Sequence, residues 1–307
     1  MPKVSVIMPC YKSRSTLAAA VGSVRRQSMT DWELIAVDDG SPEKDGELLE
    51  TLAADEPRLR VIRQENAGVS AARNAGILAA GGDWLFFLDA DDRMEEKALE
   101  TLLSLADDDT DILCGAYRLL DRATGEAHTV CCARGDLAAV QESLIRGDSA
   151  LNSMCARLYR RRMIAERGIL APAGIAVGED VLFNLEAFAA AGAWRMTDDV
   201  VYTYDYGGES AMVQARRDVY RKSLPMLLGI GAFLRREGLA TARFRAHIDA
   251  WLRMLRADRG RLRAAAAFDR GVVREITRDV EPGKLTGKER LYYAALRLCP
   301  PSSILLP

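Results

Sequence analysis

The sequence predicts an α/β protein with a doubly wound, mostly parallel sheet, followed by a C-terminal helical region. Two observations predict this fold. Short apolar or β-branched runs alternate with helical patterns over roughly the first 110 residues. Beyond about residue 207 the alternation stops and only helical patterns follow. The first part is therefore expected to form the parallel sheet, with helices on both of its faces.

Each expected strand is a short apolar run, and each expected helix has apolar residues at helical spacing. The run "DWLFFL" is apolar on both faces, so we expect it at the centre of the sheet. Ser70 stands where a helix N-cap is expected. The expected strands are residues 4–9, 33–39, 60–64 and 83–88, and the expected helices are 16–27, 43–56, 70–81 and 95–106.

Composition narrows the class of protein. The chain has 307 residues, 49% of them hydrophobic, and a net charge of −2. A soluble globular protein fits these values, and no overall field favours nucleic acid. The chain begins directly with a strand pattern, so we expect no signal peptide and a cytoplasmic location. Six cysteines without a CxxC pair are expected to stay reduced, and two histidines far apart make a zinc site unexpected.

Polar residues follow four expected strands, at the point where each strand ends. In an open α/β sheet, ligands bind beyond the carboxyl ends of the strands. Four polar segments that leave the strands at one edge, here called the polar exits, therefore indicate a binding site. The exits are Pro9-Cys10-Tyr11-Lys12, Asp38-Asp39-Gly40-Ser41, Asn66-Ala67-Gly68 and Asp89-Ala90-Asp91-Asp92.

The residue types at these exits suggest the ligand. Asp89 and Asp91 are two positions apart, and such close carboxylates suit Mn²⁺ or Mg²⁺. Since Mg²⁺ is usually shared with substrate phosphates, the cation implies a phosphorylated ligand. Asp38 and Asp39 could accept hydrogen bonds from a nucleobase or ribose, and Tyr11 could stack on the base. Each motif alone is also compatible with an ordinary turn, a helix cap or core packing.

The motifs taken together resemble a known family. "VSVIMPCYKS", "ELIAVDDGS", "NAGVSAARNAGI" and "FLDADD", in this order, are similar to the family 2 glycosyltransferases with a GT-A fold. "NSMCARLYRR" and "GEDVLFN" resemble later motifs of that family. The resemblance covers roughly residues 3–206. It implies transfer of a sugar from a nucleotide-sugar donor, with UDP as the expected carrier, to a hydroxyl of a glycan or lipid-linked acceptor, with inversion.

The resemblance also implies roles for individual residues. Asp89 and Asp91 would form the DxD metal site, and Arg73 would lie near the base or the diphosphate. Asp180 would be the general base, and Glu179 could orient it or bind acceptor hydroxyls. Because both acids stand at the start of an expected helix, its dipole is expected to lower the pKa of Asp180. The expected donor-binding residues are Pro9, Tyr11, Asp38, Asp39, Asn66, Gly68, Arg73, Asp89 and Ala90.

The expected domain boundaries follow from these assignments. Residues 1–210 would form the catalytic domain, with the nucleotide-sugar half at about 1–110 and the acceptor half at about 111–210. Residues 211–307 would form a helical subdomain. The stretch 216–263 is rich in arginine, so it is either a solvated face or a peripheral contact with the inner face of an anionic membrane.

Two other functions are weighed against transfer. A sugar-nucleotide-binding protein without turnover would share the same donor site. A serine hydrolase is suggested only by "GVSAA", in which Ala72 replaces the last glycine of G-x-S-x-G. Three departures from the family pattern stand out: Lys12 where asparagine is frequent, Arg157 where lysine is frequent, and Asp205 where a basic residue is common.

Overall fold

The computed structural model describes most of the chain up to residue 206 and scattered segments beyond it. The chain divides into two compact units, Met1–Arg216 and Arg217–Pro307, and all predicted site residues belong to the first. The predicted boundary at residue 210 and most of the predicted basic helices lie outside the described residues. The described residues are 2–146, 150–175, 177–206, 226, 229–234, 236–238, 280, 282–287, 290 and 293–294.

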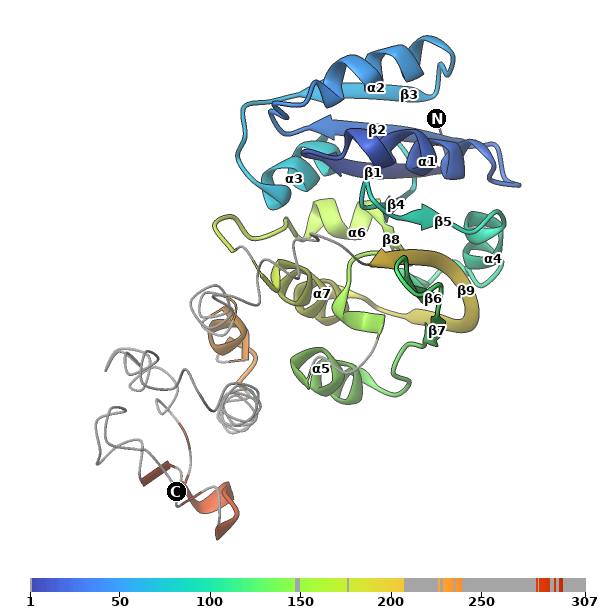
Figure 1. The fold of residues 1–307 in the computed structure, drawn as a ribbon. Helices are drawn as coiled ribbons and strands as arrows, with labels where there is room; N and C mark the ends of the chain where they lie inside the picture. Colours follow the sequence, from blue (N-terminus) through green and yellow to red (C-terminus); the bar gives the residue numbers. More distant parts are fainter. Residues whose placement is uncertain are drawn as a thin grey trace. The chain divides into compact units, whose positions relative to one another are not determined.

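A mixed sheet forms the first unit (Figure 1). Within the described residues it has nine strands, in the order β3-β2-β1-β4-β8-β6-β9-β5, with β7 paired to β6. The first four strands in this order are parallel. They are β1 (Val4–Cys10), β2 (Trp32–Asp38), β3 (Leu59–Arg63) and β4 (Trp84–Phe87). The predicted central position of residues 83–88 is confirmed, because β4 lies between β1 and β8 with all four residues buried.

The second half of the sheet is mixed. Strand β8 is antiparallel to both β4 and β6, whereas β9 runs parallel to β6 and antiparallel to β5. These strands come from segments far apart in the chain, so their pairing cannot be predicted from any single stretch of sequence. They are β5 (Arg93–Met94), β6 (Ile112–Asp121), β7 (Ala127–Val130), β8 (Arg157–Arg160) and β9 (Trp194–Tyr206).

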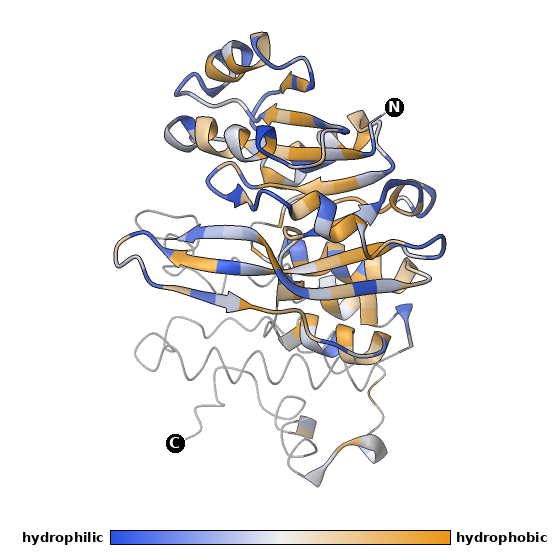
Figure 2. Ribbon diagram, turned by 90° about the vertical axis from the view of Figure 1, so that its right-hand side faces the viewer, coloured by the Kyte–Doolittle hydropathy of each residue, from blue (hydrophilic) through white to orange (hydrophobic). Residues whose placement is uncertain are grey.

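Helices cover both faces of the parallel part. Leu34 and Ala36 of β2 face a large apolar cluster that includes residues of α1, whereas Ile35 and Val37 face Ala72 of α3. This alternation is what a strand buried on both faces requires, and Figure 2 shows the apolar strands between more polar loops. The helices are α1 (Arg14–Arg25), α2 (Asp45–Ala54), α3 (Val69–Ala79), α4 (Ala98–Leu103), α5 (Leu137–Arg146), α6 (Arg161–Glu166) and α7 (Glu179–Ala190), with short 3₁₀ turns η1 (Ala150–Asn152) and η2 (Pro282–Lys284).

The predicted cap at Ser70 is wrong. The cap residue of α3 is Gly68, at φ +89°, a conformation that glycine adopts readily and other residues rarely adopt. Ser70 lies in the first turn instead, where its buried Oγ has no hydrogen-bond partner among the described residues. The helix therefore starts one residue earlier than expected, and its entry is organised by a carboxylate from another loop.

Helix α3 packs unusually close to the sheet at Gly76. A Cβ at this position would lie 2.3 Å from Cγ2 of Ile7, so only glycine fits without a shift. The close approach holds α3 against β1 and thereby fixes the residues that α3 presents at the sheet edge. No helix among the described residues is long and apolar enough to span a bilayer.

Candidate functional site

The polar exits meet at one edge of the sheet, as predicted. Strands β1, β2 and β4 are parallel neighbours, so their carboxyl ends lie side by side. Asp38 pairs in register with Cys10, and the N–H of Asp39 donates to the carbonyl of Cys10 at 2.9 Å. The N–H of Leu88 donates to the carbonyl of Ile7 at 3.0 Å, which brings the acidic loop after β4 to the same edge.

Asp39 organises the loop between β3 and α3. Its Oδ1 accepts hydrogen bonds from the side-chain amide of Gln64 at 2.7 Å and from the N–H of Ala67 at 2.9 Å, and its Oδ2 accepts from the N–H of Gly68 at 2.8 Å. The amide of Asn66 donates to the carbonyl of Asp39 at 3.0 Å. Asp39 is 3% exposed, so a buried carboxylate shapes this part of the predicted donor site.

A second buried acid, Asp45, ties together the loops after β1 and β2. Its Oδ2 accepts from the N–H of Ser13 at 2.7 Å and from the hydroxyl of Ser41 at 3.0 Å. Between these anchors Lys12 adopts φ +54°, a left-handed conformation that asparagine tolerates better than lysine does. The ammonium of Lys12 lies 5.1 Å from the ring centre of Tyr11, whose side chain is 45% exposed. The exposed ring remains available for the stacking predicted from sequence.

Arg73 gathers three carboxylates into one cluster. Its Nη1 lies 2.7 Å from Oδ1 of Asp180 and 2.9 Å from Oε1 of Glu179. Its Nη2 lies 3.0 Å from Oδ1 of Asp89. The Arg73 side chain is only 4% exposed, so these charges interact with little screening by solvent. One guanidinium thus joins the predicted base to the first acid of the predicted metal motif.

The environment of Asp180 raises its pKa to about 7. Burial of the carboxyl is the main cause, the charges of Glu179 and Asp89 add to it, and Arg73 and the N–H of Met154 oppose it. The expectation that the helix dipole would lower this pKa is therefore wrong, although α7 does begin at Glu179. Withdrawal from water outweighs a partial charge at the helix start. A carboxyl with this pKa can exchange a proton near neutral pH.

The loop after β4 presents its acids in different directions. Asp92 is 2% exposed and accepts from the Tyr202 hydroxyl at 2.6 Å and from the N–H of Asp205 at 2.9 Å. Asp91 is exposed, and the loop atoms around its carboxyl together with the charge of Asp89 raise its pKa. Asp92 is therefore structural, whereas Asp91 is directed to solvent.

The carboxylates fit a hard cation shared with a substrate. Among the described residues no group of three or more acidic, histidine or cysteine side chains could hold an ion alone. Asp89 and Asp91 offer oxygen ligands, and desolvation together with the charge of Asp89 raises the pKa of Asp91, while Arg122 opposes the shift. In proteins Mg²⁺ is usually bound by one or two carboxylates, and phosphate oxygens of the substrate complete its coordination. Asp89 and Asp91 would then be the protein ligands.

Sequence reasoning missed three contributors to the site. Tyr202 donates to Asp92 and accepts from the N–H of Asp89 at 3.1 Å. The thiol of Cys155 lies 3.6 Å from Oδ2 of Asp89. Arg122 donates from Nη2 to the carbonyl of Asp91 at 2.7 Å. The turn signal in "DRATG" predicts a hairpin near Arg122, but the strand pairing that brings this hairpin to the acidic loop has no local signal.

The departure at Arg157 has a structural explanation. This side chain is fully buried, and its guanidinium donates to the carbonyls of Leu151 at 3.1 Å and Cys155 at 3.3 Å, and also to that of Ala150. It therefore fixes η1 and the segment that carries Met154, whose N–H bonds to Asp180. Ser70 does not form a nucleophile site, because its hydroxyl is buried inside α3.

Comparison with known proteins places this geometry in a family. The family model described as glycosyl transferase family 2 matches residues 5–168, which include the acidic loop, Arg73 and the exits of all four parallel strands. The chain belongs to glycosyl transferase family 2. The region of Glu179 and Asp180 lies beyond the matched residues.

Relatives and solved structures agree with this membership. The chain is 34% identical over 214 residues to an uncharacterized glycosyltransferase, EpsJ, of Bacillus subtilis, covering 66% of this chain and 61% of EpsJ. It is 29% identical to TarP of Staphylococcus aureus, a poly(ribitol-phosphate) β-N-acetylglucosaminyltransferase, covering 66% of this chain and 62% of TarP. The crystal structure of S. aureus TarS 1–349 superposes with a TM-score of 0.70 at 17% identity, covering 96% of this chain and 87% of that one. The predicted GT-A fold is therefore confirmed.

Contacts bring the predicted site residues together in two groups. Asp39, Asn66 and Gly68 form the loop group, and Arg73 joins Asp89, Glu179 and Asp180. Asp38 is buried beside the first group, where its Oδ1 accepts from the N–H of Ser41 at 3.0 Å. Pro9 lies next to the last residue of β1 and Tyr11 follows that strand at this edge, and Ala90 is buried between the two acids of the predicted metal motif. The role of each residue in binding or catalysis remains a prediction.

Proposed function

We propose that this chain transfers a sugar from a nucleoside diphosphate donor, with UDP as the carrier, to a hydroxyl of a glycan or lipid-linked acceptor. The observation that carries this proposal is the Arg73 cluster. Asp180, whose pKa is raised to about 7, binds the same Arg73 guanidinium as Asp89 of the acidic loop. A proton acceptor beside a diphosphate site is what sugar transfer to a hydroxyl requires.

The comparisons support a nucleotide-sugar donor. TarS, whose fold this chain shares, has been solved with UDP-GlcNAc and with UDP. TarP is named for transfer of N-acetylglucosamine. The exposed Tyr11 and the loop held by Asp39 would receive the nucleoside at the ends of β1 and β2. Among the described residues no helix could span a membrane, and contact with lipid remains a separate proposal for residues 216–263.

The cation would be held by Asp89 and Asp91 together with the donor phosphates. When bound, Mn²⁺ or Mg²⁺ supplies positive charge that stabilises the leaving nucleoside diphosphate. The chain's own residues supply the rest. Arg73 keeps Asp89 and Asp180 at fixed separation, and the 18% exposure of the Asp180 side chain leaves room for a hydroxyl to reach it.

Asp180 would act as the general base. An acceptor hydroxyl is a weak nucleophile, so its proton must leave as the oxygen attacks the anomeric carbon. The oxygen–carbon bond forms while the bond from carbon to the diphosphate breaks, and Asp180 keeps the proton. Attack from the face opposite the leaving group gives inversion in one displacement. Glu179, held by the same guanidinium, would orient Asp180 or bind acceptor hydroxyls.

A panel of nucleotide-sugars tests the proposal. The purified chain is incubated with UDP-glucose, UDP-galactose, UDP-GlcNAc and GDP-mannose, with Mn²⁺ or with EDTA. Thermal shift reports binding, and release of nucleoside diphosphate reports turnover. We expect one UDP-sugar to give a metal-dependent shift and measurable hydrolysis. No response to any donor would contradict the proposal.

Two variants separate binding from chemistry. Asp91→Ala should lose the metal-dependent shift. Asp180→Asn should keep the shift and lose turnover by about 10²- to 10⁴-fold, the usual contribution of a general base. Asp198→Asn, on the surface near the start of β9, is the matched control and should change neither. Donor binding by the wild-type chain without any turnover would instead favour a sugar-nucleotide-binding protein.

A further inference from the structure

A charged group that the family pattern does not predict lies beside the acidic loop. Asp205, near the end of β9, stands where a basic residue was expected, and its side chain is 8% exposed. Its Oδ1 lies 3.1 Å from Nη2 of Arg93, and its Oδ2 lies 3.4 Å from Nη2 of Arg122. Two arginines therefore supply positive charge beside Asp205, and this acid on β9 pairs with both of them.

The main chain around Arg122 is fixed by its neighbours. Arg122 follows β6 at the start of the β6–β7 hairpin, and its N–H donates to the carbonyl of Tyr206 at 2.9 Å. The Asp121 carboxylate accepts from the N–H of Ala123 at 2.7 Å, which closes the turn. A side chain on such a turn starts from a defined position, so less entropy is lost when it binds a ligand.

The Arg122 guanidinium reaches the loop that carries the predicted metal ligand. Its Nη2 donates to the carbonyl of Asp91 at 2.7 Å. The side chain is still 42% exposed. Both described acceptors of Arg122 are at Nη2, and a guanidinium carries five N–H donors, so others can receive a further anion.

The guanidiniums supply donors for an anion at this point. Arg93 and Arg122 pair with Asp205 beside the acidic loop, and a cation held by Asp91 would offset the carboxylates around them. A guanidinium binds two oxygens of a phosphate side by side, and such charge-assisted hydrogen bonds are among the strong ones. The diphosphate of a donor held by Asp91 through a cation would lie within reach of the same loop.

We propose that Arg122 binds the diphosphate of the donor beside Asp91, and that Asp205 and the hairpin turn position it. The proposal rests on the proposed function, because it assumes a nucleoside diphosphate at this edge. Arg122 would then hold the leaving group from the side of the second half of the sheet, whereas the loops after β1 and β2 hold the nucleoside.

Binding of UDP and of uridine tests the role of Arg122. Uridine lacks both phosphates, so a phosphate contact affects UDP alone. We expect Arg122→Ala to weaken UDP binding about tenfold or more and to leave uridine binding unchanged, measured by titration calorimetry with Mn²⁺. Arg122→Lys keeps the charge but not the forked pair of donors, so its affinity for UDP should lie between those of the wild-type chain and Arg122→Ala.

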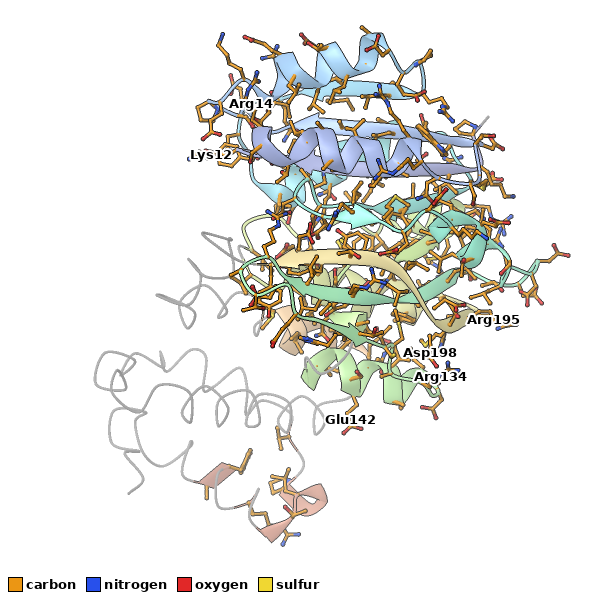
Figure 3. The ribbon with its side chains drawn as sticks, turned by 45° about the vertical axis from the view of Figure 1, so that its right-hand side comes forward. Lys12, Arg14, Arg134, Glu142, Arg195 and Asp198 are labelled. Carbon is orange, nitrogen blue, oxygen red and sulfur yellow. The ribbon has the colours of Figure 1, made fainter. Side chains whose placement is uncertain are left out.

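Arg134→Ala is the matched control. Arg134 also pairs with an aspartate of β9, because its Nη2 lies 2.8 Å from Oδ2 of Asp198, and its side chain is 62% exposed. Figure 3 shows Arg134 and Asp198 together at the opposite side of the unit from Lys12, which marks the nucleoside edge. This variant should bind UDP like the wild-type chain.

Each remaining outcome is decisive. Unchanged UDP affinity in Arg122→Ala would overturn the inference, and so would an equal loss for UDP and uridine, which would indicate a disturbed loop. Failure of the wild-type chain itself to bind UDP would remove the proposed function and the inference with it. The failures are distinguishable because the first two leave wild-type binding and turnover intact.

Discussion

Two groups of acids lie at the same edge of the sheet, and they are stabilised in different ways. Asp38 and Asp39, after β2, are buried and accept mainly neutral donors from nearby loops, such as the N–H groups of Ser41 and Gly68. Asp89, Glu179 and Asp180 share one cation, Arg73, which lies up to 107 positions away in the chain.

The difference teaches what each group can do. Several neutral donors around a buried acid fix the conformation of a loop, and no single one of them carries the whole stabilisation. A single buried cation among three acids holds together segments that are otherwise independent, and it leaves the charge of each acid sensitive to pH and ligand. The first group builds the site, and the second is suited to chemistry.

Removing the cation should have the largest effect on stability. Arg73→Met leaves three carboxylates close together without compensation, so we expect a loss of about 3–5 kcal/mol in the free energy of unfolding at pH 8. Urea denaturation followed by circular dichroism measures it. The loss should shrink at pH 5, where the cluster can take up protons.

Arg60→Met is the control for this comparison. Arg60 pairs with Glu33 at 3.9 Å and its side chain is 55% exposed, so we expect a loss below about 1 kcal/mol. Equal losses in the two variants would show that the Arg73 cluster is not a distinct structural unit.

The proposed role of Asp180 as general base predicts a pH dependence of turnover. The carboxylate is the active form of a base, so kcat should fall about tenfold per pH unit below a pH of about 7. Stability should change in the opposite direction. Because the folded chain binds this proton more tightly than the unfolded chain does, stability should decrease as pH rises from about 4 towards 7.

Thermal unfolding of the ligand-free chain across this pH range checks the sign. Asp180→Asn removes the titrating group and should flatten the decrease relative to wild type. An identical slope in the variant would assign the pH dependence to other groups.

A substitution at Asp38 or Asp39 should lower the free energy of unfolding less than Arg73→Met does. Asp39→Asn replaces the negatively charged acceptor of the N–H groups of Ala67 and Gly68, so we expect a loss of about 1–2 kcal/mol in urea denaturation. Asp38→Asn should lower the free energy of unfolding still less, since within the described part of the chain Asp38 accepts from the N–H of Ser41 and lies 3.7 Å from Nε of Arg63. A loss in Asp39→Asn as large as that in Arg73→Met would erase the distinction between the two groups.

The smallest effect is expected at Lys12. Lys12→Asn should raise the free energy of unfolding by a few tenths of a kcal/mol, up to about 1 kcal/mol, because asparagine tolerates the left-handed backbone. Lys12→Ala provides the control, since alanine lacks this tolerance and should give no gain. Differential scanning fluorimetry without donor would detect the difference.

The sequence predicted the parallel half of the fold and the edge that carries the site. A run such as "WLFFL" is apolar at every position and so indicates a strand buried on both faces. Once the strands are known to be parallel neighbours, the acids at the ends of β2 and β4 are expected at one edge of the sheet. The mixed half was not predicted, because β9 pairs with β6 and β5 through contacts between distant segments.

The errors within the site have the same origin. The start of α7 was found from local signals, but the sign of the pKa shift of Asp180 depends on burial by other segments. Ser70 had the right residue type for a cap, yet Asp39 from another loop binds the N–H of Gly68 at the helix entry. Arg122 was missed because its importance depends on where a hairpin lies in space.

The Tyr202 hydroxyl has a mechanical consequence. It links the N–H of Asp89 and the carboxylate of Asp92 to β9, four residues before that strand ends at Tyr206. The Tyr202 side chain therefore fastens the acidic loop to β9. Displacing the loop requires either breaking these two hydrogen bonds or moving Tyr202 and its strand with the loop.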